Sequence, residues 1–336
     1  MKKICICGGG SLGHICLAVL SSQKDIEVNL LTTKPEKWNH EIVVTDLEGK
    51  TYNGKINIIT DKPEIVISQS DIVFFCLPGF AIKDELIKIK PFLKESTIVG
   101  SIVSSTGFFF FAHEVLGKQA KLFGFQRVPF IARTEEYGKS ANLLGYKASL
   151  NVAIENVDNL EEFRQDIELL FLTPTYLLKS FYEAALTNSN PILHTGRLYS
   201  MWHDWDGTPF DHCILFYKEW TVDAAQLLID MDEEFMQLLD KLPMNKSAIP
   251  TLLDYYESCD AETLAAKLRS IKAFQPIKAP MKEVEGGWIP DFESRYFIED
   301  FPFGLRFIHD LSLEFGLNCP TINNVYEWGM NVSKPY

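Results

Sequence analysis

Two segments in the second half of the chain carry side chains suited to acid–base chemistry. Asn190 and His194 lie four residues apart in the helical pattern "TNSNPILHTGRL", so we expect them on one helix face, one turn apart. Histidine is the usual general acid or base near neutral pH, and Asn190 is a candidate substrate-binding neighbour. The second segment, "GGWIPDFESRYFIEDFPFGL", is crowded with aromatic residues yet contains Arg295, Glu299 and Asp300. Charges in apolar surroundings are costly unless they are paired or used, so this segment is a candidate wall of a substrate pocket.

A glycine-rich turn near the N-terminus indicates a nucleotide site. The strand pattern "ICIC" runs directly into "GGGSLG" and then into an apolar helix pattern, which is G-x-G-x-x-G in its strand–turn–helix context. In this motif Gly8 permits the tight turn, Gly10 lets the backbone approach a pyrophosphate, and Gly13 lets the helix pack closely on the strand. The helix N-terminus then faces the phosphates. The residues expected to bind the dinucleotide here are Gly8, Gly10, Ser11, Leu12 and Gly13.

The end of the second predicted strand, "NLLTTKPEKW", carries no acidic residue to bind the 2′-hydroxyl of NAD. Thr32 could bind that hydroxyl instead, whereas Lys34 could neutralise the 2′-phosphate of NADP or simply be a solvated loop residue. The sequence therefore allows NAD or NADP and leans towards NADP. A further strand ends in "CLPGFA", and strand ends form the ligand crevice of such sheets. We therefore expect three more residues to lie over the cofactor, namely Pro78, Gly79 and Phe80.

Composition excludes several classes of partner. The 336 residues include 46% hydrophobic residues and carry a formal net charge of −13. This acidic balance argues against a nucleic-acid or anionic-membrane partner, because phosphate binding depends on clusters of lysine and arginine. The seven cysteines are scattered without a CxxC pair, and we see neither a secretory signal pattern nor an apolar run of the ~20 residues that a spanning helix needs. We expect buried, reduced thiols in a cytoplasmic protein.

The pattern of segments changes near residue 180. Before it, apolar strand patterns such as "DIVFFCLPG" and "STIVGSIVSS" alternate with helix patterns such as "FAIKDELIKIKPFL", which predicts a parallel sheet covered by helices. After it, segments such as "YKEWTVDAAQLLIDMDEEFMQLLDKL" have helical periodicity. We expect an α/β fold with a Rossmann-type dinucleotide-binding domain at residues 1–180. A mostly α-helical substrate and catalytic domain follows at residues 181–336.

Several of these motifs together resemble the octopine/nopaline dehydrogenase family of opine dehydrogenases. The matching pieces are "CICGGGSLGH", "VFFCLPGFA", the histidine helix, "WDG" at 205–207, "LFY" at 215–217 and "GGWIPDFESRYFIEDFPFGL". They occur in family order over nearly the whole chain, and the last piece is long and specific. The resemblance implies NADH- or NADPH-dependent reduction of the imine formed between a 2-oxo acid and the amino group of an amino acid.

The resemblance also implies roles for individual residues. His194 would be the acid/base, paired with Asp300, and Arg295 would hold a substrate carboxylate, which suits a guanidinium fork. The stretches "SSTGF" and "FQRVPF" would face the amino-acid substrate, which makes Ser105 and Arg127 candidate substrate-binding residues. Their identities leave the amino substrate open. Arg295 and Asp300 are five positions apart, a spacing that shares a face in neither a helix nor a strand, so we expect a bend between them.

The sequence leaves alternatives for the role of Asp300, for metal binding and for the function of the protein. Asp300 before "FPFGLRFIHD" also fits a helix N-cap with a proline in the first turn. The segment "HDWDGTPFDH" has metal-ligating residue types, but its spacing fits no standard site and its Asp-Gly indicates a turn, so we expect no metal. At the level of function, two alternatives are a related 2-oxo or 3-hydroxy acid reductase without an imine step and a non-catalytic nucleotide-sensing protein. A homo-oligomer is compatible with the sequence.

Overall fold

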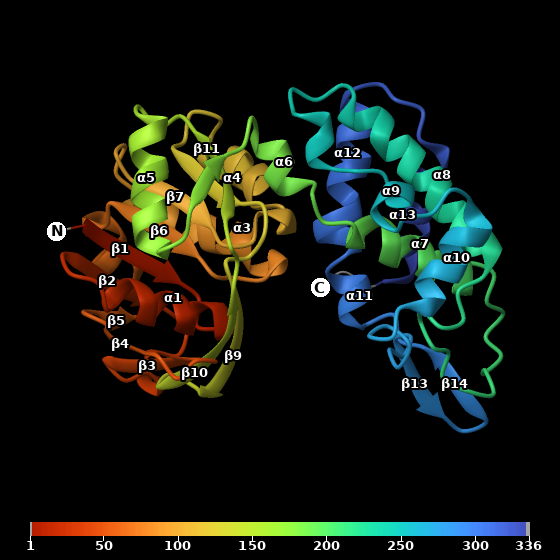
Figure 1. The fold of residues 1–336 in the computed structure, drawn as a ribbon, viewed down its shortest axis with the longest axis horizontal. Helices are drawn as coiled ribbons and strands as arrows, with labels where there is room; N and C mark the ends of the chain where they lie inside the picture. Colours follow the sequence, from red (N-terminus) through yellow and green to blue (C-terminus); the bar gives the residue numbers. More distant parts are fainter. Residues whose placement is uncertain (1, 334–336) are drawn as a thin grey trace. The chain divides into compact units, whose positions relative to one another are not determined.

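The structure is a computed structural model that describes residues 2–333. It contains two compact units, of which the first ends at Ala185 and the second begins at Leu186 (Figure 1). The first unit is built on an eight-stranded sheet of order β12-β11-β8-β7-β6-β1-β2-β5. Neighbouring strands are parallel except β8 and β11. The strands are β1 (Lys2–Cys7), β2 (Ile26–Leu31), β5 (Ile59–Thr60), β6 (Ile72–Phe75), β7 (Ile98–Ser101), β8 (Leu122–Phe125), β11 (Leu150–Glu155) and β12 (Thr175–Leu177).

Helices cover both faces of this sheet, as the apolar strands require. Ile4 and Phe74 point to the face covered by α1 and α5, whereas Phe75 on the opposite face contacts Phe108 of α4. The helices of this unit are α1 (Ser11–Ser21), α2 (Pro63–Val66), α3 (Gly79–Ile89), α4 (Phe108–Leu116), α5 (Leu160–Phe171) and α6 (Phe181–Ala185). Short 3-10 turns lie at Pro35–Lys37, Ile67–Gln69, Lys90–Phe92 and Ser104–Thr106. The α/β expectation for the first half of the chain is confirmed.

A second, four-stranded sheet was not expected from the sequence. Its order is β4-β3-β10-β9, built from β3 (Glu41–Asp46), β4 (Thr51–Lys55), β9 (Phe130–Glu136) and β10 (Ser140–Tyr146). Ile42 and Val44 point inward and join the core around α1. A Cβ atom on Gly54 of β4 would lie 2.7 Å from the Cα atom of Ala18, so the sheet packs directly on α1. This explains why α1 is apolar all round, since it is covered on both sides.

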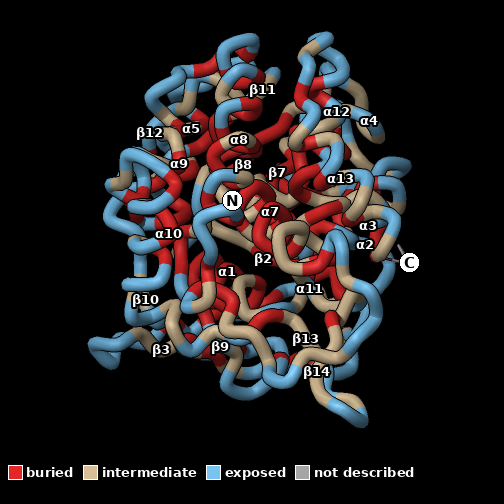
Figure 2. Tube along the Cα trace, turned by 90° about the vertical axis from the view of Figure 1, so that its right-hand side faces the viewer, coloured by how far each residue is buried: buried red, intermediate tan, exposed pale blue. Residues whose placement is uncertain are grey.

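The second unit is mostly helical, as expected. It contains α7 (Asn190–Trp202), α8 (Val222–Leu239), α9 (Leu252–Tyr255), α10 (Ala261–Ser270), α11 (Arg295–Ile298), α12 (Arg306–Glu314), α13 (Pro320–Val332) and the 3-10 turn Lys246–Ala248. Its longest helix begins where the Thr221 side chain accepts a hydrogen bond from the Ala224 amide, an N-cap that the sequence provides locally. Buried residues concentrate on α7 and α8, whereas the hairpin of β13 (Met281–Val284) and β14 (Gly287–Pro290) is mostly half-buried or exposed (Figure 2).

The aromatic segment at residues 286–305 is divided between this hairpin, α11 and a single π-helical turn, η6 (Phe301–Leu305). Phe297 and Phe301 are fully buried, stack on each other at 5.5 Å between ring centroids, and lie against Trp202 and Trp328. The rings of Phe297 and Phe301 therefore belong to the buried core of the second unit.

Two expectations from composition can be compared with the structure. All seven cysteines are free thiols, and five are buried, but Cys213 is half-buried and Cys259 is exposed. We had expected all the thiols to be buried, and Cys213 and Cys259 depart from that expectation. Over residues 2–333, no helix combines the length and the apolar character needed to cross a membrane.

Candidate functional site

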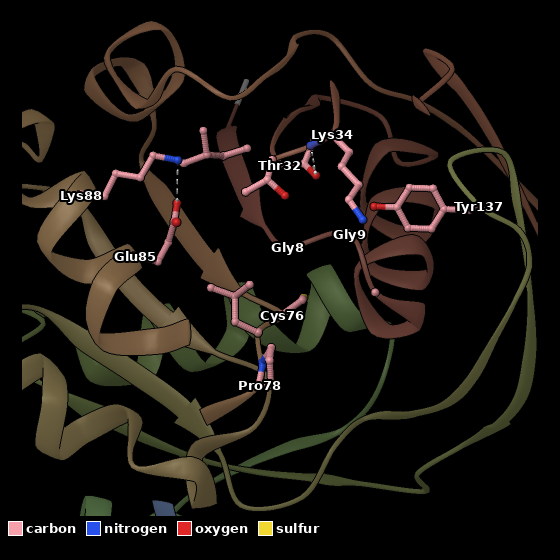
Figure 3. A pocket seen from close by; sticks show the side chains of 13 residues that line it. Gly8, Gly9, Thr32, Lys34, Cys76, Pro78, Glu85, Lys88 and Tyr137 are labelled. Carbon is pink, nitrogen blue, oxygen red and sulfur yellow. Dashed lines mark hydrogen bonds and ion pairs between the residues drawn. The ribbon is translucent and has the colours of Figure 1, made fainter. Parts of the chain in front are cut away.

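A cavity of about 290 Å³ lies where three parallel strands of the first unit end (Figure 3). The glycine turn follows β1, the Thr32 segment follows β2, and the Cys76 segment follows β6, and these strands are neighbours in the sheet. The order along the chain reverses at β1, which is where open α/β sheets form their ligand crevice. The residues that line the cavity are Gly8, Gly9, Gly10, Leu31, Thr32, Thr33, Lys34, Cys76, Leu77, Pro78, Glu85, Lys88 and Tyr137.

The glycine turn has the geometry that a dinucleotide pyrophosphate needs. Gly8 has a φ of +111°, which L side chains rarely adopt, and a Cβ atom on Gly13 would lie 2.2 Å from the Gly8 carbonyl oxygen. The helix therefore packs against the turn as the motif requires. A Cβ atom on Gly10 would meet no protein atom within 4 Å, so the backbone there borders open space that a phosphate could occupy. These residues fit a dinucleotide.

The residues predicted to bind the cofactor divide into two groups. Five line the cavity, namely Gly8, Gly10, Thr32, Lys34 and Pro78. The others lie beside it. The Ser11 hydroxyl is 3.0 Å from that of Thr134, Leu12 packs partly buried against the core, and Gly79 is the buried first residue of α3. Phe80 is 57% exposed and also lies outside the cavity lining.

Several lining residues were missed by the sequence analysis. Glu85 and Lys88 come from α3, two turns beyond the "CLPG" motif, and their charged groups are 3.8 Å apart. Burial raises the pKa of the Glu85 carboxyl, and Lys88 partly offsets this effect. Tyr137 comes from the turn between β9 and β10, and Figure 3 shows the Lys34 side chain extending towards it and towards Gly9. Helical spacing could have indicated the α3 pair, but no local signal identifies Tyr137.

His14 fixes the glycine turn from within α1. Its Nδ1 atom donates to the Gly10 carbonyl at 2.9 Å, because its Nε2 atom accepts from the Gly138 amide at 2.8 Å. The ring packs on Trp38 with centroids 4.3 Å apart, and burial lowers its pKa. His14 therefore joins the glycine turn to the β9–β10 turn as a neutral ring, and this long-range role also went unnoticed in the sequence.

The second unit brings His194 and Asp300 together, although they are 106 positions apart. The Nδ1 atom of His194 on α7 lies 2.8 Å from Oδ2 of Asp300, so the ring donates to the carboxylate. The side chains are 13% and 20% exposed. The close approach depends on Gly304, since a Cβ atom there would lie 2.7 Å from the Pro191 ring of α7. The pairing of imidazole and carboxylate is the arrangement that orients a general acid or base.

Aromatic residues surround this histidine. The hydroxyl of Tyr217 lies 3.3 Å from its Nε2 atom, and the ring of Tyr296 packs on it with centroids 4.7 Å apart. Phe216 lies edge-on at 5.7 Å. One ring nitrogen of His194 therefore faces a carboxylate and the other a phenol.

The structure places Asp300 and Arg295 in different surroundings. The Asp300 side chain makes no capping hydrogen bond to the following turn, because its carboxylate is turned to His194, so the N-cap interpretation is wrong. The helix does break between the two residues: α11 ends at Ile298 and η6 begins at Phe301. Arg295 nevertheless points outward, with its side chain 79% exposed and its guanidinium in a two-point ion pair with Glu299 at 2.8 and 3.0 Å.

Of the remaining predicted residues, Asn190 lies on the helix of His194, whereas Ser105 and Arg127 belong to the first unit. Asn190 is the first residue of α7, one turn before His194 and half-buried. Ser105 is half-buried in the 3-10 turn after β7, and Arg127 is exposed in the loop after β8. Within residues 2–333 no group of three His, Cys, Asp or Glu side chains could hold a metal ion. Gly207 has a φ of +93°, in keeping with the expected Asp-Gly turn.

Comparison with known proteins agrees with this architecture. Residues 177–333 match the family described as NAD/NADP octopine/nopaline dehydrogenase, alpha-helical domain, and residues 4–107 match ketopantoate reductase PanE/ApbA. Octopine dehydrogenase of Mizuhopecten yessoensis is 26% identical, with 99% of this chain and 91% of the relative covered. Tauropine dehydrogenase of Arabella iricolor is 27% identical, with 99% of this chain and 91% of the relative covered.

A solved structure extends the similarity to three dimensions. Octopine dehydrogenase with NADH and L-arginine superimposes with a TM-score of 0.85 at 25% identity, covering 98% of this chain and 89% of that one. The same enzyme has been solved with NADH and pyruvate. Residues 177–333 therefore form the alpha-helical domain of the NAD/NADP octopine/nopaline dehydrogenase family, and the chain is an oxidoreductase of the opine dehydrogenase type.

Proposed function

We propose that the protein uses NADH or NADPH to reduce the imine formed between a 2-oxo acid and the amino group of an amino acid. The reaction acts on a CH–NH bond. The observation that carries the proposal is the His194–Asp300 pair at 2.8 Å, which gives a dinucleotide-binding protein of this family a poised proton carrier. Octopine dehydrogenase, which has been solved with L-arginine and with pyruvate, supports an amino acid and a 2-oxo acid as the two substrate classes.

In this proposal the first unit holds the dinucleotide. Gly8 and Gly10 provide the turn and the open backbone for the pyrophosphate, with the N-terminus of α1 behind them. When bound, the reduced nicotinamide supplies the hydride. Thr32 and Pro78 border the cavity at the ends of β2 and β6. The other proposed contacts belong to the first turns of the two adjoining helices, namely Ser11, Leu12, Gly13, Gly79 and Phe80.

His194 serves as the acid/base of the second unit. Its Nδ1 proton is held by Asp300, so the proton that reaches the substrate must pass through Nε2. The carboxylate orients the ring and fixes the tautomer that carries its proton on Nδ1, as in other His–Asp pairs. Partial burial of both side chains limits competition from water.

Arg295 is the proposed carboxylate-binding residue. Its guanidinium already holds the Glu299 carboxylate at two points, which shows the fork geometry that a substrate carboxylate would use. A substrate would therefore replace Glu299 or share the guanidinium with it. Asn190, Ser105 and Arg127 remain proposed substrate contacts, and their identities suit a polar amino substrate.

Cofactor preference follows from opposed charges in the cavity. Lys34 and Lys88 favour the 2′-phosphate of NADP. The end of β2 carries no acidic residue, but Glu85 of α3 brings a carboxylate into the same cavity. A carboxylate there favours the 2′-hydroxyl of NAD over the 2′-phosphate of NADP. We propose that the site accepts both nucleotides, with Lys34 sustaining a lean towards NADPH.

The test is whether oxidation of NADH or NADPH by a 2-oxo acid requires an amine. Purified protein is mixed with pyruvate or 2-oxoglutarate, with and without a panel of amino acids, and absorbance at 340 nm is followed. We expect turnover only when both substrates are present. His194→Ala should lower kcat by about 10²–10⁴-fold, the usual share of acid–base catalysis, with nucleotide binding intact. Full turnover without an amine would instead identify a simple 2-oxo acid reductase, and nucleotide binding without any turnover would identify a sensing protein.

A further inference from the structure

The phenol of Tyr217 occupies the one direction in which His194 can exchange a proton. Asp300 accepts the Nδ1 proton at 2.8 Å, which leaves Nε2 as the exchanging nitrogen. The Tyr217 hydroxyl lies 3.3 Å from Nε2. When the ring is neutral, Nε2 is an acceptor and the phenol donates to it; when the ring is protonated, Nε2–H donates and the phenol accepts. In the second case the proton of the phenol itself is free to point elsewhere.

Tyr217 is held rigidly and in its neutral form. It is 5% exposed, and its ring stacks on Phe274 at 4.4 Å and on Trp220 at 5.8 Å between centroids. Burial raises the pKa of its hydroxyl, with smaller contributions from nearby Tyr296, Tyr256 and Asp300. The group therefore stays a phenol at neutral pH and can both donate and accept a proton.

A buried arginine fixes the segment that carries Tyr217. Arg197 is 3% exposed and lies one turn after His194 on α7. Its Nε atom donates to the Phe216 carbonyl at 3.0 Å and its Nη2 atom to the Glu219 carbonyl at 2.9 Å, so it binds the backbone on both sides of Tyr217. Burial lowers its pKa to about 10, which leaves it charged at neutral pH. A buried charge is costly, and here it ties the helix of His194 to the segment of Tyr217.

We propose that Tyr217 relays the proton between His194 and the substrate, and that Arg197 is the positioning residue for this relay. The inference rests on the proposed imine reduction. In the relay, the Nε2 proton of the imidazolium moves to the Tyr217 oxygen as the phenol proton moves to the imine nitrogen. One N–H bond forms on the substrate, the C=N bond becomes single, and the hydride that balances the electrons is the one the reduced nicotinamide supplies. His194 ends neutral, and Tyr217 is neutral before and after.

If Tyr217 had only a packing role, its ring alone would be enough. The variant Tyr217→Phe therefore separates a packing role from the proton relay. It keeps the stacking on Phe274 and Trp220 and removes only the hydroxyl. We expect kcat to fall about 10–100-fold, because water can replace part of the relay, while KM for the nucleotide is unchanged. The control is Tyr326→Phe, which removes a half-buried phenol of the same unit that stacks on His309 and should keep turnover near that of the wild type.

A second measurement does not depend on turnover. In ¹⁵N NMR of the imidazole, the wild-type protein should show His194 as the Nδ1–H form with a hydrogen-bonded Nε2, and Tyr217→Phe should move the Nε2 signal downfield. Unchanged kcat or an unchanged Nε2 signal in Tyr217→Phe overturns the relay. If the wild-type protein shows no amine-dependent turnover, the proposed function fails, whereas normal wild-type turnover with a fully active Tyr217→Phe removes the relay alone.

The role of Arg197 is tested with a double-mutant cycle. Arg197→Lys keeps the charge but cannot reach both carbonyls with one fork. We expect it to lower kcat severalfold in the wild-type background and to add little in the Tyr217→Phe background, because the relay it positions is already lost. Equal effects in both backgrounds would show a merely structural role.

Discussion

The His194–Asp300 pair makes the sharpest prediction, because Asp300→Asn changes one charge at nearly constant shape. The carboxylate accepts the Nδ1 proton of His194 at 2.8 Å in the native protein. An asparagine there can turn either its oxygen or its amide group towards the ring. The second orientation would force the proton onto Nε2 and leave the ring unable to accept a proton there.

The magnitude follows from the contact itself. A hydrogen bond to a charged partner contributes about 1.5–3 kcal/mol, and this pair is only 13% and 20% exposed, so little of that is lost to solvent. Since about 1.4 kcal/mol corresponds to a factor of ten, kcat should fall roughly 10–150-fold. KM for NADH and NADPH should hardly change, because the nucleotide cavity is formed entirely by residues of the first unit.

The assay is steady-state NAD(P)H oxidation with saturating 2-oxo acid and amino acid, accompanied by fluorescence titration of the nucleotide. The chain offers a matched control in His309 and Asp310, whose Nδ1 and Oδ1 atoms are 2.9 Å apart in the same unit. Asp310→Asn removes a carboxylate of the same type from a histidine that has no proposed role, so its turnover should match the wild type. If Asp300→Asn is within about twofold of Asp310→Asn, the acid–base role of the pair is refuted.

Further predictions concern the substrate, the cofactor and stability. Arg295→Ala should raise KM for the 2-oxo acid by about 10–100-fold in initial-rate measurements, through loss of a charge-assisted pair. Lys34→Ala should raise KM for NADPH by about tenfold and KM for NADH much less, which parallel titrations would measure. Gly10→Val should abolish nucleotide binding while leaving the thermal unfolding of the protein unchanged, since its side chain would enter open space. Burial raises the pKa of Asp232 to about 6, against about 3.9 in an unfolded chain, so protonation favours the folded state as pH falls between these values. Asp232→Asn should therefore raise the free energy of unfolding by about 3 kcal/mol at pH 7 and by little at pH 4, as denaturant titrations at the two pH values would show.

Local patterns in the sequence determined a large part of this protein. The glycine turn, the alternation of apolar strands with helices and the later helical periodicity are written in neighbouring residues, because each depends on spacings of two to six positions. They led to the two-part architecture, the nucleotide motif and the family. His194 was a candidate from its place on a helix face, and the family resemblance gave it its expected role.

Contacts between distant segments decided the rest. The pairing of Asp300 with His194 depends on η6 packing against α7 at Gly304, and the capping pattern around Asp300 gave a different expectation. The second sheet, the Glu85 wall of the cavity and the Tyr217 hydroxyl all arise where strands, helices and turns from separate parts of the chain meet. Such contacts are set by packing in three dimensions, which periodicity along one segment does not encode.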